Sequence, residues 1–227
     1  MQMIDPISDF DWATLYSRYD KRCPPQFDTW AESIAVCFSR PLSDRSLYYA
    51  LIRHFAEEFR SESGISIETY EAMLYWKLYF NGSYVKRMCG ELIRNKTRRE
   101  LTAVQLKILS KEFPKNIPHK ASSAISLQRK LAKQELWGTI SDSALAVRST
   151  LLHFLYPGSV PIFDTQVLAA VGIFTPKANE DARVLSEYVP FALSLAEKHR
   201  HKLIGFQNET AVRLVDMALW VVRGGCN

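Results

Sequence analysis

The sequence of 227 residues lacks most of the features that mark membrane, secreted or metal-binding proteins. No apolar run reaches the roughly 18 residues that a membrane-spanning helix needs. The segment Met1 to Pro6 has neither the basic nor the apolar region of a signal peptide. Four cysteines occur without C-x-x-C spacing, which argues against a zinc ribbon or an iron–sulfur cluster. We therefore expect a cytoplasmic protein with reduced thiols, no metal, no cofactor and no membrane partner.

Alternating apolar and polar residues, which are typical of half-buried strands, are also missing. Apolar residues recur instead at intervals of three and four, which favours helices. We predict an all-α fold, as a single domain over 1–227 that can divide into an N-terminal lobe (1–80) and a second lobe (81–227). The expected helices cover 9–21, 27–39, 43–61, 66–80, 83–94, 97–112, 122–135, 141–155, 164–171, 179–199 and 208–223. Start signals precede three of them, at Ser43, Ser66 and Asn179.

Charge is distributed unevenly along the chain. The formal net charge is +5, yet Lys86 to Lys133 holds 13 Lys or Arg against 3 Glu, a surplus of +10 that leaves about −5 for the remainder. We call this segment the basic block. Such a block is either a solvated face or a surface that binds a polyanion. Its concentration in a fifth of the chain favours nucleic acid as the partner.

The segment Val160 to Val167 carries the residue of greatest interest, Asp164. This aspartate stands between a loop that contains Pro161 and an apolar run. Asp is a favoured helix N-cap, because its carboxylate accepts backbone N–H groups of the first turn. A carboxylate in a dry pocket is also the group that stabilises a developing cation. One aspartate can do both.

Two stretches of the sequence resemble the helix–hairpin–helix DNA glycosylase superfamily. In that family a turn of the type L-P-G-V-G-x-K-T-A leads through a helix and a loop to P-x-x-V-D-T-H-V, which contains the catalytic Asp. Here the corresponding stretches are 136–144, LWGTISDSA, and 161–167, PIFDTQV. Asp164 matches the family Asp and Thr165 the family Thr. The similarity covers residues 122–175, and 215–220 resemble the last helix of small proteins with an 8-oxoguanine-glycosylase-type fold.

The sequence also departs from the family pattern. The first glycine of the turn is kept as Gly138, but Ile140 stands in place of the second. The Schiff-base Lys of the family falls on Asp142, and Gln166 replaces the family His. Because a covalent mechanism needs an amine nucleophile, we predict a monofunctional enzyme that uses Asp164 and water, without lyase activity.

The resemblance implies a two-lobed helical fold with a degenerate hairpin, and a monomer that acts on double-stranded DNA with a damaged or modified base. The glycosidic bond would break through an oxocarbenium-like transition state stabilised by the carboxylate. The target base must leave the helix, so the enzyme needs a pocket and a phosphate grip. We expect DNA contacts from the turn and from basic side chains: Gly138, Thr139, Ser141, Arg148, Lys130 and Lys133. Repair of damaged purines and defence against modified phage DNA both remain open.

Lys77 is the best substitute for the missing hairpin Lys, since it lies in an aromatic-rich segment, 73–79. A surface lysine whose stem covers apolar neighbours is the more frequent case. The candidate base pocket comprises Trp76, Tyr75, His153 and Phe163, although core packing is the usual role of such aromatics.

Two alternatives belong to other functional classes. Arg148 and His153 fit the R-x4-H pattern of HEPN-type ribonucleases, which are also all-α, but roughly one such match is expected by chance. A lone His in an apolar helix is more often a core residue. The basic block alone is equally consistent with a non-catalytic helical DNA-binding protein.

Overall fold

The computed structural model describes residues 3–22, 43–79, 82–139, 144–173, 181–206 and 208–224, and every regular element in these ranges is helical. The predicted all-α class is therefore confirmed. The elements are η1 (Trp12–Thr14), α1 (Leu15–Arg22), α3 (Asp44–Arg60), α4 (Ile67–Leu78), α5 (Gly82–Arg94), α6 (Lys96–Glu112), α7 (Ala121–Ala132), α8 (Leu145–Leu155), α9 (Thr165–Ala170), α10 (Asp181–Lys198), η4 (Arg200–Gly205) and α11 (Ala211–Gly224).

Side-chain caps explain where several helices begin. Ser43 and Ser46 form a reciprocal capping box at the start of α3, and Ser66 accepts the Thr69 amide at the start of α4. Asn95 caps α6 in the same way. The predicted starts at Ser43 and Ser66 are thus confirmed, whereas Asn179 and the helix expected over 27–39 lie outside the described residues.

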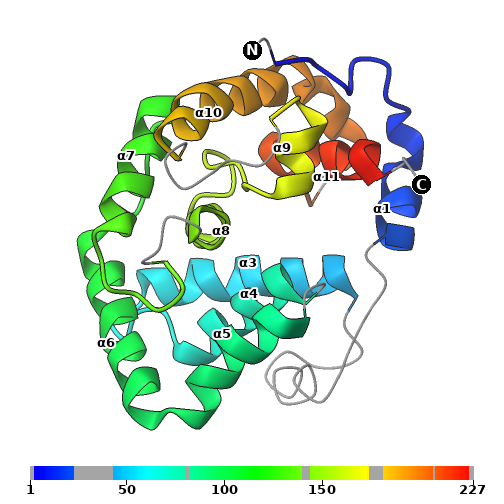
Figure 1. Cartoon of the computed structure of the whole chain (residues 1–227). Helices are drawn as coiled ribbons and strands as arrows, with labels where there is room; N and C mark the ends of the chain where they lie inside the picture. Colours follow the sequence, from blue (N-terminus) through cyan, green and yellow to red (C-terminus); the bar gives the residue numbers. More distant parts are fainter. Residues whose placement is uncertain are drawn as a thin grey trace.

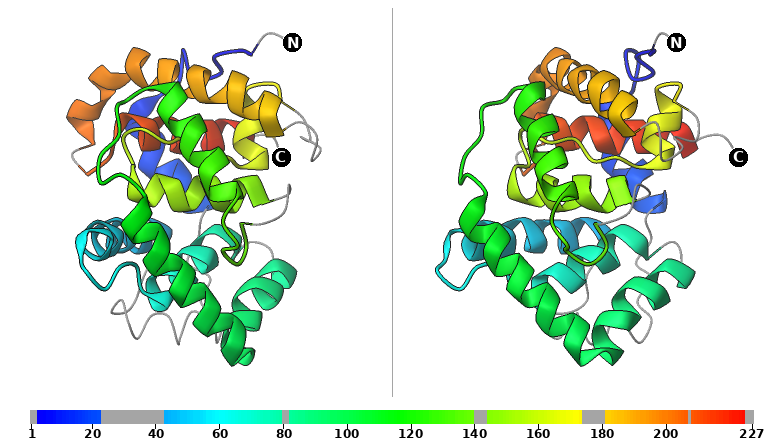
Figure 2. Two further views of the ribbon diagram at one scale, coloured as in Figure 1. Left: turned by 90° about the vertical axis from the view of Figure 1, so that its left-hand side faces the viewer. Right: turned by 60° about the vertical axis from the view of Figure 1, so that its left-hand side comes forward.

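The helices form two layers that are held apart by one central helix. Figure 1 shows α1, α9, α10 and α11 on one side and α3, α4 and α5 on the other, with α6 and α7 running along one edge between them. Helix α8 lies between the layers and packs against α3, α4 and α7, as both views of Figure 2 show. The core is continuous through all of these helices.

The two layers do not follow a sequence boundary at residue 80. Helix α1, near the start of the chain, packs against α11 near its end, and α5 packs against α4 across residue 80. The reason is that α1 carries apolar side chains, Leu15 and Tyr19, that are buried in the core together with those of α11. Each layer therefore combines segments from both predicted lobes.

No helix among the described residues is long and apolar enough to cross a membrane. Within the same ranges, no group of three or more His, Cys, Asp or Glu side chains is placed to hold a metal ion. Cys89 is buried and forms no disulfide within the described residues, and the other three cysteines lie outside those residues.

Candidate active site

The loop after α8 folds back along that helix and so places Asp164. Near its end, the Phe163 amide donates a hydrogen bond to Ser149 Oγ at 2.8 Å, in the first half of α8. Earlier in the loop, the Val160 carbonyl contacts His153 Nδ1 at 2.7 Å. The chain therefore returns towards the start of α8, and Asp164 lies on the same side of the molecule as the turn that precedes this helix.

Asp164 is both a helix cap and the partner of a buried lysine. Its Oδ1 accepts the Gln166 amide at 2.9 Å, which caps α9. Its Oδ2 accepts a hydrogen bond from Lys77 Nζ at 2.9 Å, and the same ammonium donates to the Phe163 carbonyl at 3.2 Å. The Lys77 side chain is only 8% exposed, against 25% for Asp164. Lys77, proposed from the sequence as a substitute nucleophile, is thus in direct contact with the candidate catalytic carboxylate.

The surroundings of Asp164 favour its ionised form. Burial would raise the pKa of this carboxyl, but the charge and hydrogen bond of Lys77, together with the Gln166 amide, outweigh it and hold the pKa below the ordinary value. Asp164 is therefore a carboxylate at neutral pH. A carboxylate is the form that can stabilise a cation or accept a proton from water.

A small pocket opens beside this ion pair. Its volume is about 50 Å³, enough for a few water molecules. It is lined by Tyr19, Asp44, Trp76, Lys77, Tyr79, Ile162, Asp164, Arg213, Asp216 and Trp220. The lining combines aromatic walls with three carboxylates and two cations. A nucleobase would enter only after side chains at the rim have moved.

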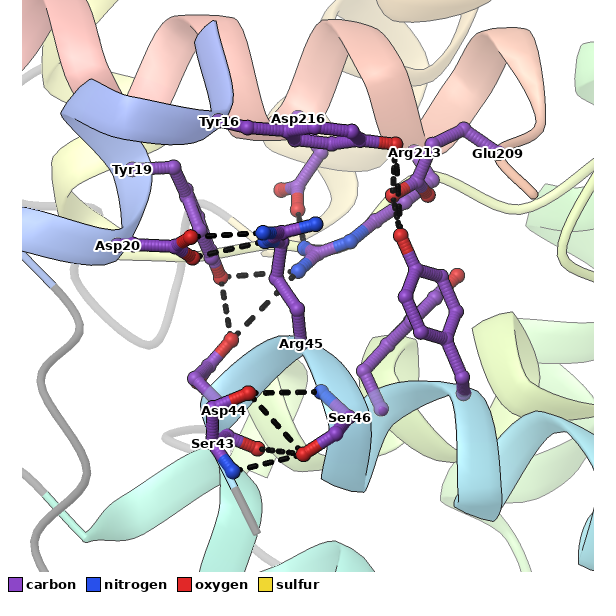
Figure 3. Close-up of polar contacts among 12 residues, drawn as sticks. Tyr16, Tyr19, Asp20, Ser43, Asp44, Arg45, Ser46, Glu209, Arg213 and Asp216 are labelled. Atoms are coloured by element: carbon purple, nitrogen blue, oxygen red, sulfur yellow. Dashed lines mark hydrogen bonds and ion pairs between the residues drawn. The ribbon is translucent and has the colours of Figure 1, made fainter. Parts of the chain in front are cut away.

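Buried charges form the floor of this pocket. Arg213, which is 2% exposed, contacts Asp216 Oδ2 and donates from Nη2 to Tyr19 Oη at 2.9 Å. Tyr19 Oη in turn donates to Asp44 Oδ1 at 2.9 Å. Figure 3 shows Arg213 reaching Asp216 on one side and Tyr19 and Asp44 on the other. The guanidinium therefore joins α1, α3 and α11 below the pocket.

Arg213, Asp216 and Asp44 were not identified from the sequence. A signal exists for two of them, since an Arg and an Asp occur three positions apart in the otherwise apolar stretch 211–222. Oppositely charged residues at this spacing on a buried helix face are rarely left unpaired. Asp44 carried no such signal, because its partners Tyr19 and Arg213 are remote in sequence.

The four residues predicted for the base pocket have different positions. Trp76 lines the pocket. Tyr75 is buried beside it, with its ring stacked on that of Tyr79 at 6.1 Å between centroids. Phe163 is 1% exposed and packs on Tyr188, so it contributes its carbonyl and not its ring. His153 is wholly buried. The last three are core residues, which differs from the expectation.

His153 is held in the interior by both ring nitrogens. Nε2 lies 2.7 Å from Tyr48 Oη, and Nδ1 lies 2.7 Å from the Val160 carbonyl. Since a carbonyl only accepts, Nδ1 carries the proton and Nε2 accepts from Tyr48. Burial lowers the pKa of His153 to about 3. The imidazole is therefore neutral across the physiological range.

This neutral histidine should make the protein less stable in acid. Between pH 6.5 and about 3 the folded form leaves His153 unprotonated while the unfolded chain protonates it, so the free energy of unfolding falls as the pH falls. His153→Gln keeps an acceptor for Tyr48 and a donor for Val160 but does not titrate. Between pH 7 and 5, urea unfolding should show the wild type losing about 2 kcal/mol more than the variant. Equal losses in both proteins would contradict this assignment.

The turn before α8 is packed tightly onto α4 and α5. Gly138 has φ +86°, a conformation that side chains rarely adopt, and a Cβ here would lie 2.7 Å from the Met88 side chain. The neighbouring Trp137 donates from its indole to the Met88 carbonyl, and its own carbonyl accepts from Tyr70. The positive φ is therefore what requires glycine here, because the contact with Met88 is only with the end of a flexible side chain.

Two residues that we expected to contact DNA are instead buried, Thr139 in this turn and Arg148 on α8. Thr139 is wholly buried, and its amide and hydroxyl both donate to the Leu136 carbonyl. Arg148, 4% exposed, donates to the Thr139 carbonyl at 3.0 Å. Both therefore fix the shape of the turn and its attachment to α8. Ser141 lies outside the described residues.

The basic block covers α5, α6 and α7, and of these α6 and α7 follow one edge of the molecule (Figure 1). Lys130 is engaged there, since it donates to the Glu112 carbonyl at 2.8 Å and lies over the Phe113 ring. Lys133, at the end of α7, is exposed. Other exposed cations of the block are Lys86, Arg87, Arg94, Lys96, Lys107, Lys111, Lys115, Lys120 and Arg129. Solvent-facing positive charge thus predominates along this edge.

No protein-family model, no curated protein and no solved structure matches the chain with significant similarity. The role of the pocket must therefore be inferred from its own residues and their chemistry.

Proposed function

We propose that this protein is a DNA glycosylase that extracts a damaged or modified base and hydrolyses its N-glycosidic bond. The supporting observation is the pairing of Asp164 with the largely buried side chain of Lys77, both of which line a pocket with aromatic walls. An ionised carboxylate beside such a pocket is suited to an oxocarbenium-like transition state. On this proposal the fold is a divergent two-lobed glycosylase-like arrangement with a degenerate helix–hairpin–helix.

Asp164 would act on both the sugar and the attacking water. Its negative charge would stabilise the sugar cation that develops as the base departs, and its free lone pairs would orient and deprotonate the attacking water. The aromatic walls of the pocket, among them Trp76 and Tyr79, would receive the extracted base after the rim opens. Lys77 would keep Asp164 ionised and in place.

DNA is the partner that the charge distribution supports. Helix α5 begins four residues after the end of α4, where Lys77 stands, and it packs against α6 of the basic edge. The exposed Lys86 and Arg87 lie on this helix. A duplex that lies along the edge would have its phosphates near α5 while one nucleotide reaches Asp164. Such binding would weaken steeply with salt.

A lyase mechanism is the second candidate, because Lys77 Nζ lies 2.9 Å from Asp164. Because Lys77 Nζ is held by the Asp164 carboxylate and the Phe163 carbonyl, the lysine is not placed as a nucleophile, and we therefore expect no borohydride-trapped protein–DNA adduct. If an adduct does form with the wild type, its loss in Lys77→Ala and its retention in Lys86→Ala would assign the lyase reaction to Lys77.

The ribonuclease alternative has less support. Arg148 and His153 are both buried, and each is hydrogen-bonded to a backbone carbonyl. Neither lines the pocket. Cleavage of RNA by the wild type, and its loss in His153→Ala, would restore that hypothesis.

The glycosylase proposal is tested by the formation of abasic sites. Duplexes that each carry one damaged or phage-type modified base are incubated with the protein and then heated in alkali, which breaks DNA at abasic sites. Alkali-dependent cleavage at the modified position is the expected result. Cleavage at none of the modified positions, by a protein that binds the duplexes, would favour the non-catalytic DNA-binding alternative.

A further inference from the structure

The three carboxylates of the pocket are held in different ways. Asp44 has both oxygens occupied, since Oδ1 accepts from Tyr19 at 2.9 Å and Oδ2 accepts from Tyr79 at 3.2 Å. Asp164 has one oxygen on its own helix and the other on Lys77. Asp216 lines the pocket and is bound through Oδ2 to Arg213, and among the described residues no hydrogen bond to its Oδ1 is seen. Asp216 is thus the carboxyl best placed to exchange a proton with an occupant of the pocket.

Arg213 fixes the position of Asp216 from the same helix. The two residues stand three positions apart on α11 and are 2% and 5% exposed. The guanidinium is itself fixed, because Nη2 donates to Tyr19 and the Tyr48 ring lies 4.3 Å from it. In Figure 3 the Asp216 carboxylate meets the end of this guanidinium. A carboxyl anchored on one side in this way has little freedom to turn.

The charges around Asp216 come from several helices. Arg213 on α11, Lys77 on α4 and Asp164 before α9 all act on it electrostatically. From α3 and α10 it faces Tyr48 and Tyr188, both of which burial keeps neutral by raising the pKa of their phenols. Burial raises the pKa of Asp216 to about 6, Arg213 and Lys77 oppose this, and Asp164 adds to it. By contrast, the pKa of Asp164 is lowered.

A pair of carboxyl groups whose environments push their pKa values apart is suited to separate acid and base roles. A glycosidic bond breaks more easily if the departing base receives a proton, because the electron pair of the bond otherwise leaves as an anion. An acid with a pKa near 6 is still partly protonated at neutral pH. The site therefore offers a base in Asp164 and an acid in Asp216.

We propose that Asp216 is the proton donor to the departing base, and that Arg213 positions it. This inference rests on the glycosylase function proposed above. In the reaction the bond from C1′ to the base nitrogen breaks, its electron pair stays on the base, and the Asp216 proton moves to a ring nitrogen or oxygen of the base. Water adds its hydroxyl to C1′ and gives its proton to Asp164. Both carboxyls then return to their initial states by exchange with solvent.

The role of Asp216 as proton donor predicts how the rate of base release depends on pH. The donor must be protonated, so the single-turnover rate should fall about tenfold per unit above about pH 6. Asp164 must be ionised, so the rate should also fall in acid, but only at a pH below the ordinary pKa of a carboxyl group. Below pH 6 the rate should therefore be flat until that limb is reached.

The test compares single-turnover rates from pH 5 to 8 on the duplex from which the wild type releases most base. Asp216→Asn keeps an acceptor oxygen for Arg213 but has no acidic proton. We expect a loss of about 10²-fold or more at pH 6 and no falling limb. Asp216→Glu should keep the falling limb. Asp20→Asn, on the exposed ion pair with Arg45, is the matched control and should follow the wild type.

Each other outcome overturns the assignment. A falling limb that persists in Asp216→Asn, or a loss of rate that is equal at every pH, would reduce Asp216 to a structural role while base release itself stands. A wild-type rate that is flat from pH 5 to 8 would have the same meaning and needs no folded variant. Release of no base from any duplex would remove both the donor and the glycosylase function.

Discussion

Asp164→Asn should abolish base release while leaving the fold and the binding of DNA nearly intact. Asn retains an oxygen that can accept the Gln166 amide and is as good an N-cap as Asp, so α9 should still begin at residue 165. What is lost is the negative charge that would face the sugar and that neutralises Lys77, whose ammonium keeps the Phe163 carbonyl as an acceptor. We expect a decrease of at least about 10³-fold in the single-turnover rate, measured as alkali-sensitive sites per unit time.

A second capping aspartate provides the control for this variant. Asp11 caps η1 by accepting the Ala13 amide at 3.2 Å and does not line the pocket. Asp11→Asn should therefore keep full activity. If Asp164→Asn released base as fast as the wild type, Asp164 would be only a helix cap, and the site assigned here would be wrong.

Arg213→Met should strongly lower the stability of the folded protein. The substitution keeps an unbranched apolar stem in the core but removes the cation between Asp44 and Asp216. Two carboxyls would then be buried without their counter-charge. Breaking a buried ion pair by removing one partner costs about 3–5 kcal/mol. Urea unfolding at pH 7 should show a decrease of this size in the free energy of unfolding.

An exposed ion pair gives the matched comparison. Arg200 and Glu197 are each more than 60% exposed, so Arg200→Met should change stability by at most about 1 kcal/mol. The loss in Arg213→Met should also become smaller at pH 5, because burial raises the pKa of Asp44 and Asp216 and the uncompensated carboxyls can then take up protons. A loss below about 1 kcal/mol at pH 7 would show that Arg213 is not the counter-charge of these groups.

The helices were predictable because each depends on local pattern. Helix α3 needs only the Ser43 cap and an apolar face, and both are visible in the sequence. The same holds for the approach to Asp164, where a proline-containing loop precedes a cap and an apolar run. Lys77 was identified as a candidate because it is a charged residue in an aromatic segment.

The floor of the pocket was not predictable in this way. Asp44 and Arg213 are 169 positions apart and meet only because α1, α3 and α11 converge. His153 illustrates the opposite error, since its type suggested chemistry while the surrounding core gave both nitrogens structural partners. In both cases the outcome depends on tertiary neighbours, which no local pattern contains.

The most direct test of the central claim is mass spectrometry of free bases released by the wild-type protein. The substrates are duplexes with damaged purines and duplexes with modified bases of the phage type, with Asp164→Asn as the blank. We predict that one modified base appears in free form, that the matching abasic site remains in the DNA, and that the blank releases none. If no free base is found although the protein binds these duplexes, or if Asp164→Asn releases the same base equally fast, the pocket around Asp164 is not a glycosylase active site.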